Sequence, residues 1–188
     1  RQMCIRDRII TDPSYAGQII TFTFPHIGNV GTNLDDLERE NAAAAGIIVK
    51  SDITAASNYR ATQDFSCWLA STGLTGIAGV DTRNLTRRIR DFGAMNGIIS
   101  FSNKKCFDID ELTIKAQSHP SLSGMDLASD VSSRELEKWS TGTWKFGSKK
   151  NDDGFENTER KDYHIVAIDY GAKRNILRNL AQLGAKIT

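Results

Sequence analysis

Residues 11–33, TDPSYAGQIITFTFPHIGNVGTN, decide the fold of the first half of this chain. Within them, the side chains of residues 18–24 alternate between two sides. Ile20, Phe22 and Phe24 face one side, and Ile19, Thr21 and Thr23 face the other. That period of two predicts a strand with at least one buried face. Asp12 and Pro13 predict a turn before it, because proline fixes φ and aspartate accepts hydrogen bonds from nearby amides. Such a turn either only connects elements or carries binding residues.

Short apolar segments alternate with amphipathic segments after this strand, which is typical of an α/β fold. The clearest helix begins after Thr62, which we expect to cap it, and presents Phe65, Trp68 and Leu69 on one face before Gly73 ends it. Asn33 is expected to cap a short helical turn in the same way. The other expected elements are strands at residues 45–50, 76–80 and 97–101 and helices capped by Asp81 and Asp108.

The helix after Asp81 carries a row of cations. Its expected buried stripe is Leu85, Ile89 and Phe92. The other side presents four arginines, which form either a solvated face or a docking face for an acidic partner or phosphate. The four are Arg83, Arg87, Arg88 and Arg90.

Composition excludes several classes of protein. The 188 residues are 39% hydrophobic and carry a formal net charge of +1, so neither nucleic acid nor an anionic membrane is an expected partner. No apolar run approaches the roughly 20 residues that span a bilayer. Cys4, Cys67 and Cys106 are far apart and never in a CxxC spacing, which disfavours disulfides and a metal site and fits a reducing cytoplasm.

The two ends of the chain differ from the middle in composition and in apolar pattern. The first eight residues, RQMCIRDR, resemble a foreign segment joined to the start of a strand at Ile9 and Ile10. Residues 145–162 are polar, charged and glycine-containing, as in a linker between domains. Residues 163–188 then read as a buried strand, a helix and the start of another strand, the beginning of a parallel sheet. One such unit cannot bury both faces of its strand, so we expect the chain to be a fragment.

Catalytic motifs are missing from this sequence. It contains no GxSxG or GxCxG elbow, no phosphate-binding P-loop and no GxGxxG. The turn Asp169-Tyr170-Gly171 opens the last helix and either is a plain connection or offers amides to an anion. Residue chemistry alone therefore indicates a two-domain cytoplasmic α/β protein of undetermined function.

Four segments of the chain resemble the small subunit of glutamine-hydrolysing carbamoyl-phosphate synthetase. They are TDPSYAGQIITFTFPHIGNVGTN, AGVDTRNLTRRIRDFGAMNGIIS, LSGMDLASDV and IDYGAKRNILRNLAQLGAKIT, and they occur in the family's order. The resemblance implies a β/β/α-type amino-terminal domain at residues 9–144, lacking its first strands. It further implies that residues 163–188 begin a parallel-sheet class I glutamine amidotransferase domain.

The function implied by this resemblance is glutamine hydrolysis by a cysteine nucleophile with histidine and glutamate. The ammonia passes to a large subunit, where ATP, magnesium and bicarbonate yield carbamoyl phosphate for arginine and pyrimidine synthesis. The small subunit of this heterodimeric ligase holds no cofactor or metal. All three catalytic residues are expected after the position of Thr188, so we expect this chain alone to be inactive. The serine of TDPSY, Ser14, is expected to bind glutamine.

Two alternatives stay open on the sequence. One is a non-catalytic module that docks a large synthetase subunit through the four arginines. The other is an unrelated α/β protein that binds a small molecule.

Overall fold

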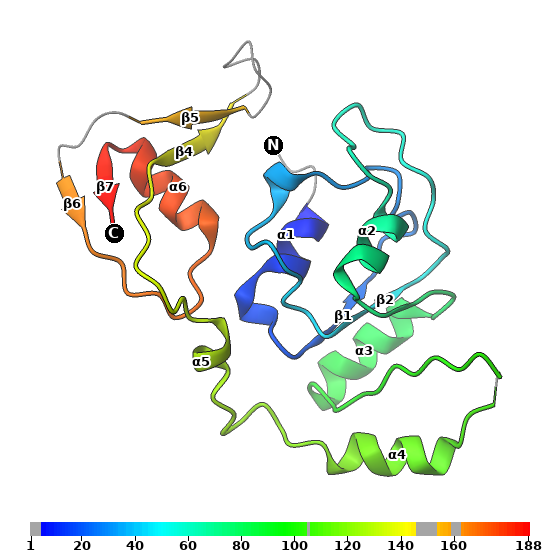
Figure 1. The fold of residues 1–188 in the computed structure, drawn as a ribbon. Helices are drawn as coiled ribbons and strands as arrows, with labels where there is room; N and C mark the ends of the chain where they lie inside the picture. The colour runs from blue at the N-terminus through cyan, green and yellow to red at the C-terminus, as the bar shows by residue number, and fades with distance from the viewer. Residues whose placement is uncertain (1–4, 105, 146–153, 159–162) are drawn as a thin grey trace. The chain divides into compact units, whose positions relative to one another are not determined.

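The structure is a computed structural model that describes residues 5–104, 106–145, 154–158 and 163–188 (Figure 1). These residues divide into two compact units, each assembled from segments that are distant in the sequence. The first unit comprises residues 1–16, 33–43 and 127–188, and the second comprises residues 17–32 and 44–126.

A three-stranded parallel sheet lies at the centre of the second unit. Its strands are β1 (Ile19–Phe22), β2 (Gly46–Val49) and β3 (Gly76–Ile77), in the order β1-β2-β3. Phe22, Ile47 and Val49 are buried, so the expected apolar face of this sheet is confirmed. Phe24 lies beyond the end of β1 and is 46% exposed, so the strand is shorter than the alternation predicts.

Helix α2 (Phe65–Thr72) buries the predicted face. Phe65, Trp68 and Leu69 are buried, and the rings of Phe65 and Trp68 stack with their centroids 6.0 Å apart. Gly73 ends the helix with a φ of 68°, the left-handed conformation that glycine adopts without strain. The helix begins after Asp64, so the predicted cap at Thr62 is wrong.

Helices α3 (Thr82–Phe92) and α4 (Ile109–Ser118) are capped as predicted. The Asp81 carboxylate accepts a hydrogen bond from the amide of Asn84, and the Asp108 carboxylate accepts one from Glu111. The buried stripe of α3 is only partly confirmed, because Phe92 is 82% exposed. The strand expected at residues 97–101 is also wrong: this apolar segment pairs with no described strand and has irregular backbone.

The first unit contains a strand–helix–strand unit near the end of the chain. Strand β6 (Tyr163–Ile165) runs parallel to β7 (Ala185–Ile187), and α6 (Arg174–Gln182) connects them (Figure 1). Ala181, Ala185 and Ile187 form its buried core, with Trp139 packed against them. The unit's remaining elements are α1 (Ile5–Thr11), η1 (Pro13–Tyr15), η2 (Leu34–Asp36), α5 (Leu127–Val131) and the antiparallel strands β4 (Thr141–Trp144) and β5 (Phe155–Asn157).

Two predictions at the ends of the chain need correction. Strand β6 ends at Ile165, and Val166 and Ile168 are 71% and 76% exposed instead of buried. Apolar residues are buried only where another element covers them, and no described strand pairs with the other edge of β6. Ile9 and Ile10 lie in helix α1 and not in a strand.

The domain boundaries stay predictions. Residues 1–4 of the proposed foreign segment, and residues 146–153 and 159–162 of the proposed linker, lie outside the described residues. No described helix is long and apolar enough to cross a membrane.

The core contact of α2 gives a stability prediction. Phe65 is completely buried, so Phe65→Ala should lower the free energy of unfolding by about 3–5 kcal/mol through lost burial and a cavity. Urea denaturation followed by circular dichroism measures this change. The neighbouring exposed residue is the control: Ser66→Ala should change stability by less than about 0.5 kcal/mol. Equal effects of the two variants would show that this face of α2 is not the core.

Candidate functional site

The predicted binding residue Ser14 lies at the tip of a turn whose base is buried. Helix α1 ends at Thr11, and Asp12 caps the 3-10 turn η1 that follows. The Asp12 Oδ1 atom accepts a hydrogen bond from the Ser14 amide at 2.9 Å. Asp12 and Pro13 are buried while Ser14 is exposed. The local sequence thus holds the backbone of Ser14 in place and leaves its side chain on the surface.

A second turn, Asp169–Gly171, packs against this one within the first unit. The Asp169 Oδ1 atom accepts hydrogen bonds from the amides of Gly171 at 2.8 Å and Ala172 at 2.5 Å. Gly171 has a φ of 95°, and a Cβ placed on it would lie 3.1 Å from the Cβ of Pro13 and 2.8 Å from a methyl of Val131. Only glycine allows this conformation and this close approach together.

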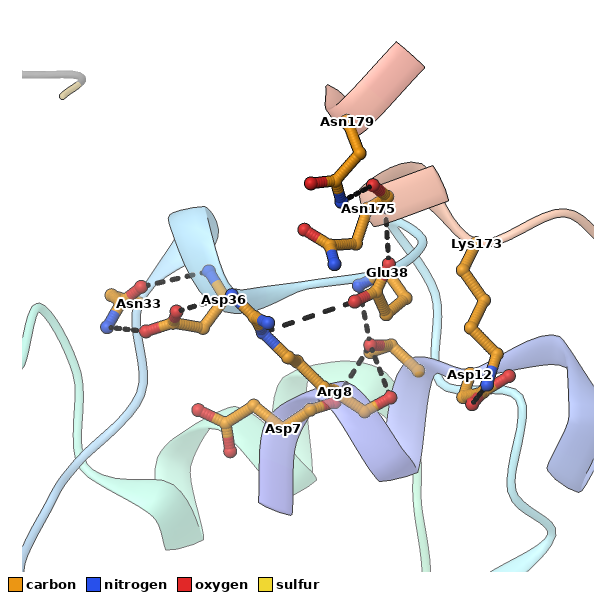
Figure 2. A network of polar contacts seen from close by, with 10 residues as sticks. Asp7, Arg8, Asp12, Asn33, Asp36, Glu38, Lys173, Asn175 and Asn179 are labelled. Atoms are coloured by element: carbon orange, nitrogen blue, oxygen red, sulfur yellow. Dashed lines mark hydrogen bonds and ion pairs between the residues drawn. The ribbon is translucent and has the colours of Figure 1, made fainter. Parts of the chain in front are cut away.

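An ion pair joins the start of α6, which follows the second turn, to the turn that carries Ser14. The Nζ atom of Lys173 lies 2.7 Å from Oδ2 of Asp12, whose side chain is only 8% exposed (Figure 2). Burial raises the pKa of Asp12, but the hydrogen bonds from Lys173 and Ser14 outweigh it and leave that pKa below its ordinary value. The hydrogen bond to Asp12 also raises the pKa of Lys173. Both groups are therefore charged at neutral pH, and the pair is electrically neutral.

Asp169 is held by contacts from three segments. Its Oδ2 atom accepts a hydrogen bond from the Ser133 amide at 2.9 Å and lies 3.4 Å from a guanidinium nitrogen of Arg39. Burial raises the pKa of Asp169, but the amide hydrogen bonds and the Arg39 charge together lower it below the ordinary value. Its carboxylate is engaged on both oxygens, which fits a structural role better than proton transfer.

The four candidate arginines of α3 belong to the second unit, whereas Ser14 belongs to the first. All four side chains are exposed, and Arg90 is 3.0 Å from the carboxylate of Asp91. Their role in binding a partner stays a prediction. The residues concerned are Arg83, Arg87, Arg88 and Arg90.

The described cysteines lie apart from the Ser14 turn in sequence. Cys67 and Cys106 are both free and exposed in the second unit, and Cys4 lies outside the described residues. In the part of the chain that the structure describes, no three histidine, cysteine or acidic side chains are grouped so that they could hold a metal ion. The expectation that none of the three cysteines is a nucleophile stays a prediction.

Lys173 is a site residue that the sequence analysis did not identify. Nothing in the local pattern predicts a contact between residue 173 and residue 12. One signal was present, because Lys173 and Arg174 stand at the first positions of α6, where the helix dipole disfavours cations. Cations at such a place indicate acidic partners elsewhere in the chain.

The fold and the site together define a class of protein. It is a mixed α/β protein with parallel strands. An exposed serine turn packs beside the loop that follows a parallel strand, and ligands of open α/β sheets bind at that end of the strands.

Comparison with known proteins identifies the family. The family model described as carbamoyl-phosphate synthase small chain, CPSase domain, matches residues 3–99. Proteins named carbamoyl phosphate synthase small chain from Brucella anthropi and Bradyrhizobium diazoefficiens are each 47% identical over 186 residues. The alignments cover 97% of this chain but only 44% and 46% of the relatives, so the chain spans about half their length. The chain belongs to the carbamoyl-phosphate synthase small-chain family, and the resemblance and the α/β fold class are confirmed.

The ion pair between the turns gives a pH prediction. Asp12→Asn should lower the free energy of unfolding at pH 7 by about 1.5–3 kcal/mol, the usual worth of a hydrogen bond to a charged group. Because the folded pKa of Asp12 is below the ordinary 3.8, its contribution is present above that value and is lost as the pH falls through the folded pKa. The two proteins should therefore converge in acid, as measured by urea denaturation from pH 7 to pH 2.

A control for this comparison is Glu111→Gln, which breaks an exposed pair with Lys115 and should cost less than about 0.5 kcal/mol. Burial raises the pKa of Asp7 to about 6, but Asp7 is present in both proteins and cancels in their difference. A loss in Asp12→Asn that is the same at every pH would contradict the prediction.

Proposed function

We propose that this chain is part of a glutamine-hydrolysing subunit that supplies ammonia for carbamoyl phosphate synthesis. The reaction on a large partner subunit would consume ATP and bicarbonate and serve arginine and pyrimidine synthesis in the cytoplasm. The observation that carries the proposal is the exposed Ser14 turn, packed on the loop after a parallel strand in a member of the small-chain family.

The chemistry proposed for Ser14 is recognition of glutamine. A hydroxyl donates one hydrogen bond and accepts others, so it can pair with the amide or the carboxylate of this substrate. The turn beneath it is held by Asp12, and the charge of Asp12 is balanced by Lys173. Binding of glutamine therefore requires no rearrangement of this backbone, which limits the entropic cost of binding.

The nucleophile of the proposed reaction is a cysteine thiolate outside residues 1–188. Neither Cys67 nor Cys106 belongs to the same unit as Ser14. In this proposal the chain contributes a substrate contact, and the thiolate that forms the acyl intermediate comes from residues that the resemblance places after Thr188. The 188-residue chain alone should then release no ammonia from glutamine.

Kinetics of the complete small subunit paired with its large subunit test this function. Ser14→Ala should raise KM for glutamine about tenfold, because one substrate hydrogen bond worth about 1.4 kcal/mol is lost. Ammonia supplied in place of glutamine bypasses this site and gives the reference rate. Ser66→Ala, an exposed serine on α2, is the matched control. An unchanged KM for glutamine in Ser14→Ala would refute the role of Ser14.

The exposed arginine face of α3 favours a second, non-catalytic role in docking the large subunit. The paired change Arg83→Glu and Arg87→Glu should weaken that association about tenfold or more at low salt, because a matched charge patch is reversed. Analytical ultracentrifugation or surface plasmon resonance measures the effect. Lys104→Glu with Lys115→Glu changes the charge equally on exposed cations of the same unit. Equal weakening by both pairs would assign the effect to net charge. Family membership removes the alternative of an unrelated α/β protein.

A further inference from the structure

Helix α6 begins without a cap from its own sequence. Lys173 occupies the N-cap position and makes no side-chain hydrogen bond to the first turn. Glu38 supplies the missing acceptor. Its Oε2 atom accepts a hydrogen bond from the backbone amide of Asn175 at 2.9 Å, although the two residues are 137 positions apart in the sequence (Figure 2). Glu38 is only 4% exposed, so this carboxylate has been taken out of water to make the contact.

The same residue contacts the end of α1, directly before the serine turn, through its backbone. The amide of Glu38 donates to Oγ of Thr11 at 2.9 Å, and the Thr11 hydroxyl donates in turn to the carbonyl of Asp7 at 2.8 Å. Thr11 is completely buried and directly precedes Asp12 in the chain. Glu38 therefore contacts the start of α6 with its side chain and the end of α1 with its backbone.

These contacts close a ring, and Figure 2 labels four of its members, Asp12, Glu38, Lys173 and Asn175. It runs from Thr11 to Glu38, from Glu38 to Asn175, along the helix to Lys173, and back through the ion pair to Asp12. The start of α6 is thus held at two points: Lys173 pairs with Asp12 in the serine turn, and Asn175 is linked through Glu38 to the end of α1, where that turn begins. Two ties restrain rotation of the helix as well as its separation from the turn, which one ion pair on a flexible lysine cannot do.

The charged residues near Glu38 differ in how much they can stabilise the ring. Arg8 lies 4.0 Å from Oε1 of Glu38 and 3.7 Å from Asp36, which also accepts a hydrogen bond from Asn33. Glu40, two residues along the chain, pairs with Arg174 at 3.2 Å, but its side chain is 83% exposed. An exposed ion pair of that kind contributes little to stability. Glu40 is therefore a suitable control, because it lies on the same segment as Glu38 and also contacts the start of α6.

We propose that Glu38 is a positioning residue for glutamine binding, because it caps α6 from outside and fixes the start of that helix against the turn that carries Ser14. The proposal rests on the proposed function. Loss of the Glu38 carboxylate leaves the Asn175 amide without its acceptor and leaves the ion pair of Lys173 as the remaining tie. The serine turn then samples more positions relative to the loop after β6, and glutamine binds more weakly.

Amide hydrogen exchange tests the cap directly. In the complete subunit, Glu38→Ala should speed exchange at Asn175 at least about tenfold, because the amide loses its acceptor. Glu38→Gln keeps a neutral acceptor of the same shape and should show an intermediate rate. Glu40→Ala should leave the Asn175 amide unchanged. If Glu38→Ala does not fold, Glu38→Gln is compared with the unchanged protein instead. An unchanged exchange rate of the Asn175 amide in the variant that folds would show that Glu38 does not cap α6.

A double-mutant cycle in the complex with the large subunit tests the positioning role. Glu38→Ala should raise KM for glutamine about tenfold with less than a twofold change in kcat, and Glu38→Gln should recover part of the loss. If Glu38 acts through Ser14, then Ser14→Ala with Glu38→Ala should be no worse than Ser14→Ala alone. Additive losses, or a KM unchanged in Glu38→Ala, overturn the proposal.

The outcomes separate this proposal from the proposed function. An unchanged KM in Ser14→Ala refutes the substrate contact, whatever the exchange rate at Asn175. A raised KM in Ser14→Ala together with an unchanged KM in Glu38→Ala refutes only the positioning role of Glu38.

Discussion

The first unit is governed by the requirement that its buried carboxylates be hydrogen-bonded. An unpaired charge in a protein interior costs several kcal/mol, so each buried acid must be brought to a donor. Asp12 meets Lys173, and Glu38 meets the amide of Asn175. These partners lie in a segment far along the chain, and satisfying them fixes which segments must meet. The arrangement of the unit follows from polar pairing as much as from its buried apolar residues, which include Ile10, Leu37, Ala181, Ala185 and Ile187.

Local patterns in the sequence predicted most of the fold because they depend on nearby residues. The caps at Asn33, Asp81 and Asp108 are confirmed, since a short polar side chain and the amide it accepts lie within three residues. The buried face of α2 and the strand–helix–strand unit at the end of the chain are confirmed for the same reason. The failures at Phe92 and residues 97–101 show that an apolar pattern reports the capacity for burial, whereas burial itself needs a covering element.

The candidate site was predictable only in part. The turn chemistry of Asp12 and Pro13 indicated a rigid loop, and the family resemblance singled out Ser14 on it. Lys173 and Glu38 were not found, because the contacts that give them a role join residues separated by most of the chain. No periodicity or capping rule reaches over such a distance. Only the cations at the start of α6 indicated that acidic partners were required.

The discontinuity of the first unit has a consequence for its biosynthesis. Residues 1–16 and 33–43 leave the ribosome long before residues 127–188, which belong to the same unit. Until then, Asp12 and Glu38 stay hydrated, and contacts over such separations form slowly because a large loop must close first. Residues 17–32 and 44–126 contain all three described strands of the β1-β2-β3 sheet and can collapse earlier. The serine turn would then take its final form only after α6 has been synthesised, later than the sheet of the second unit.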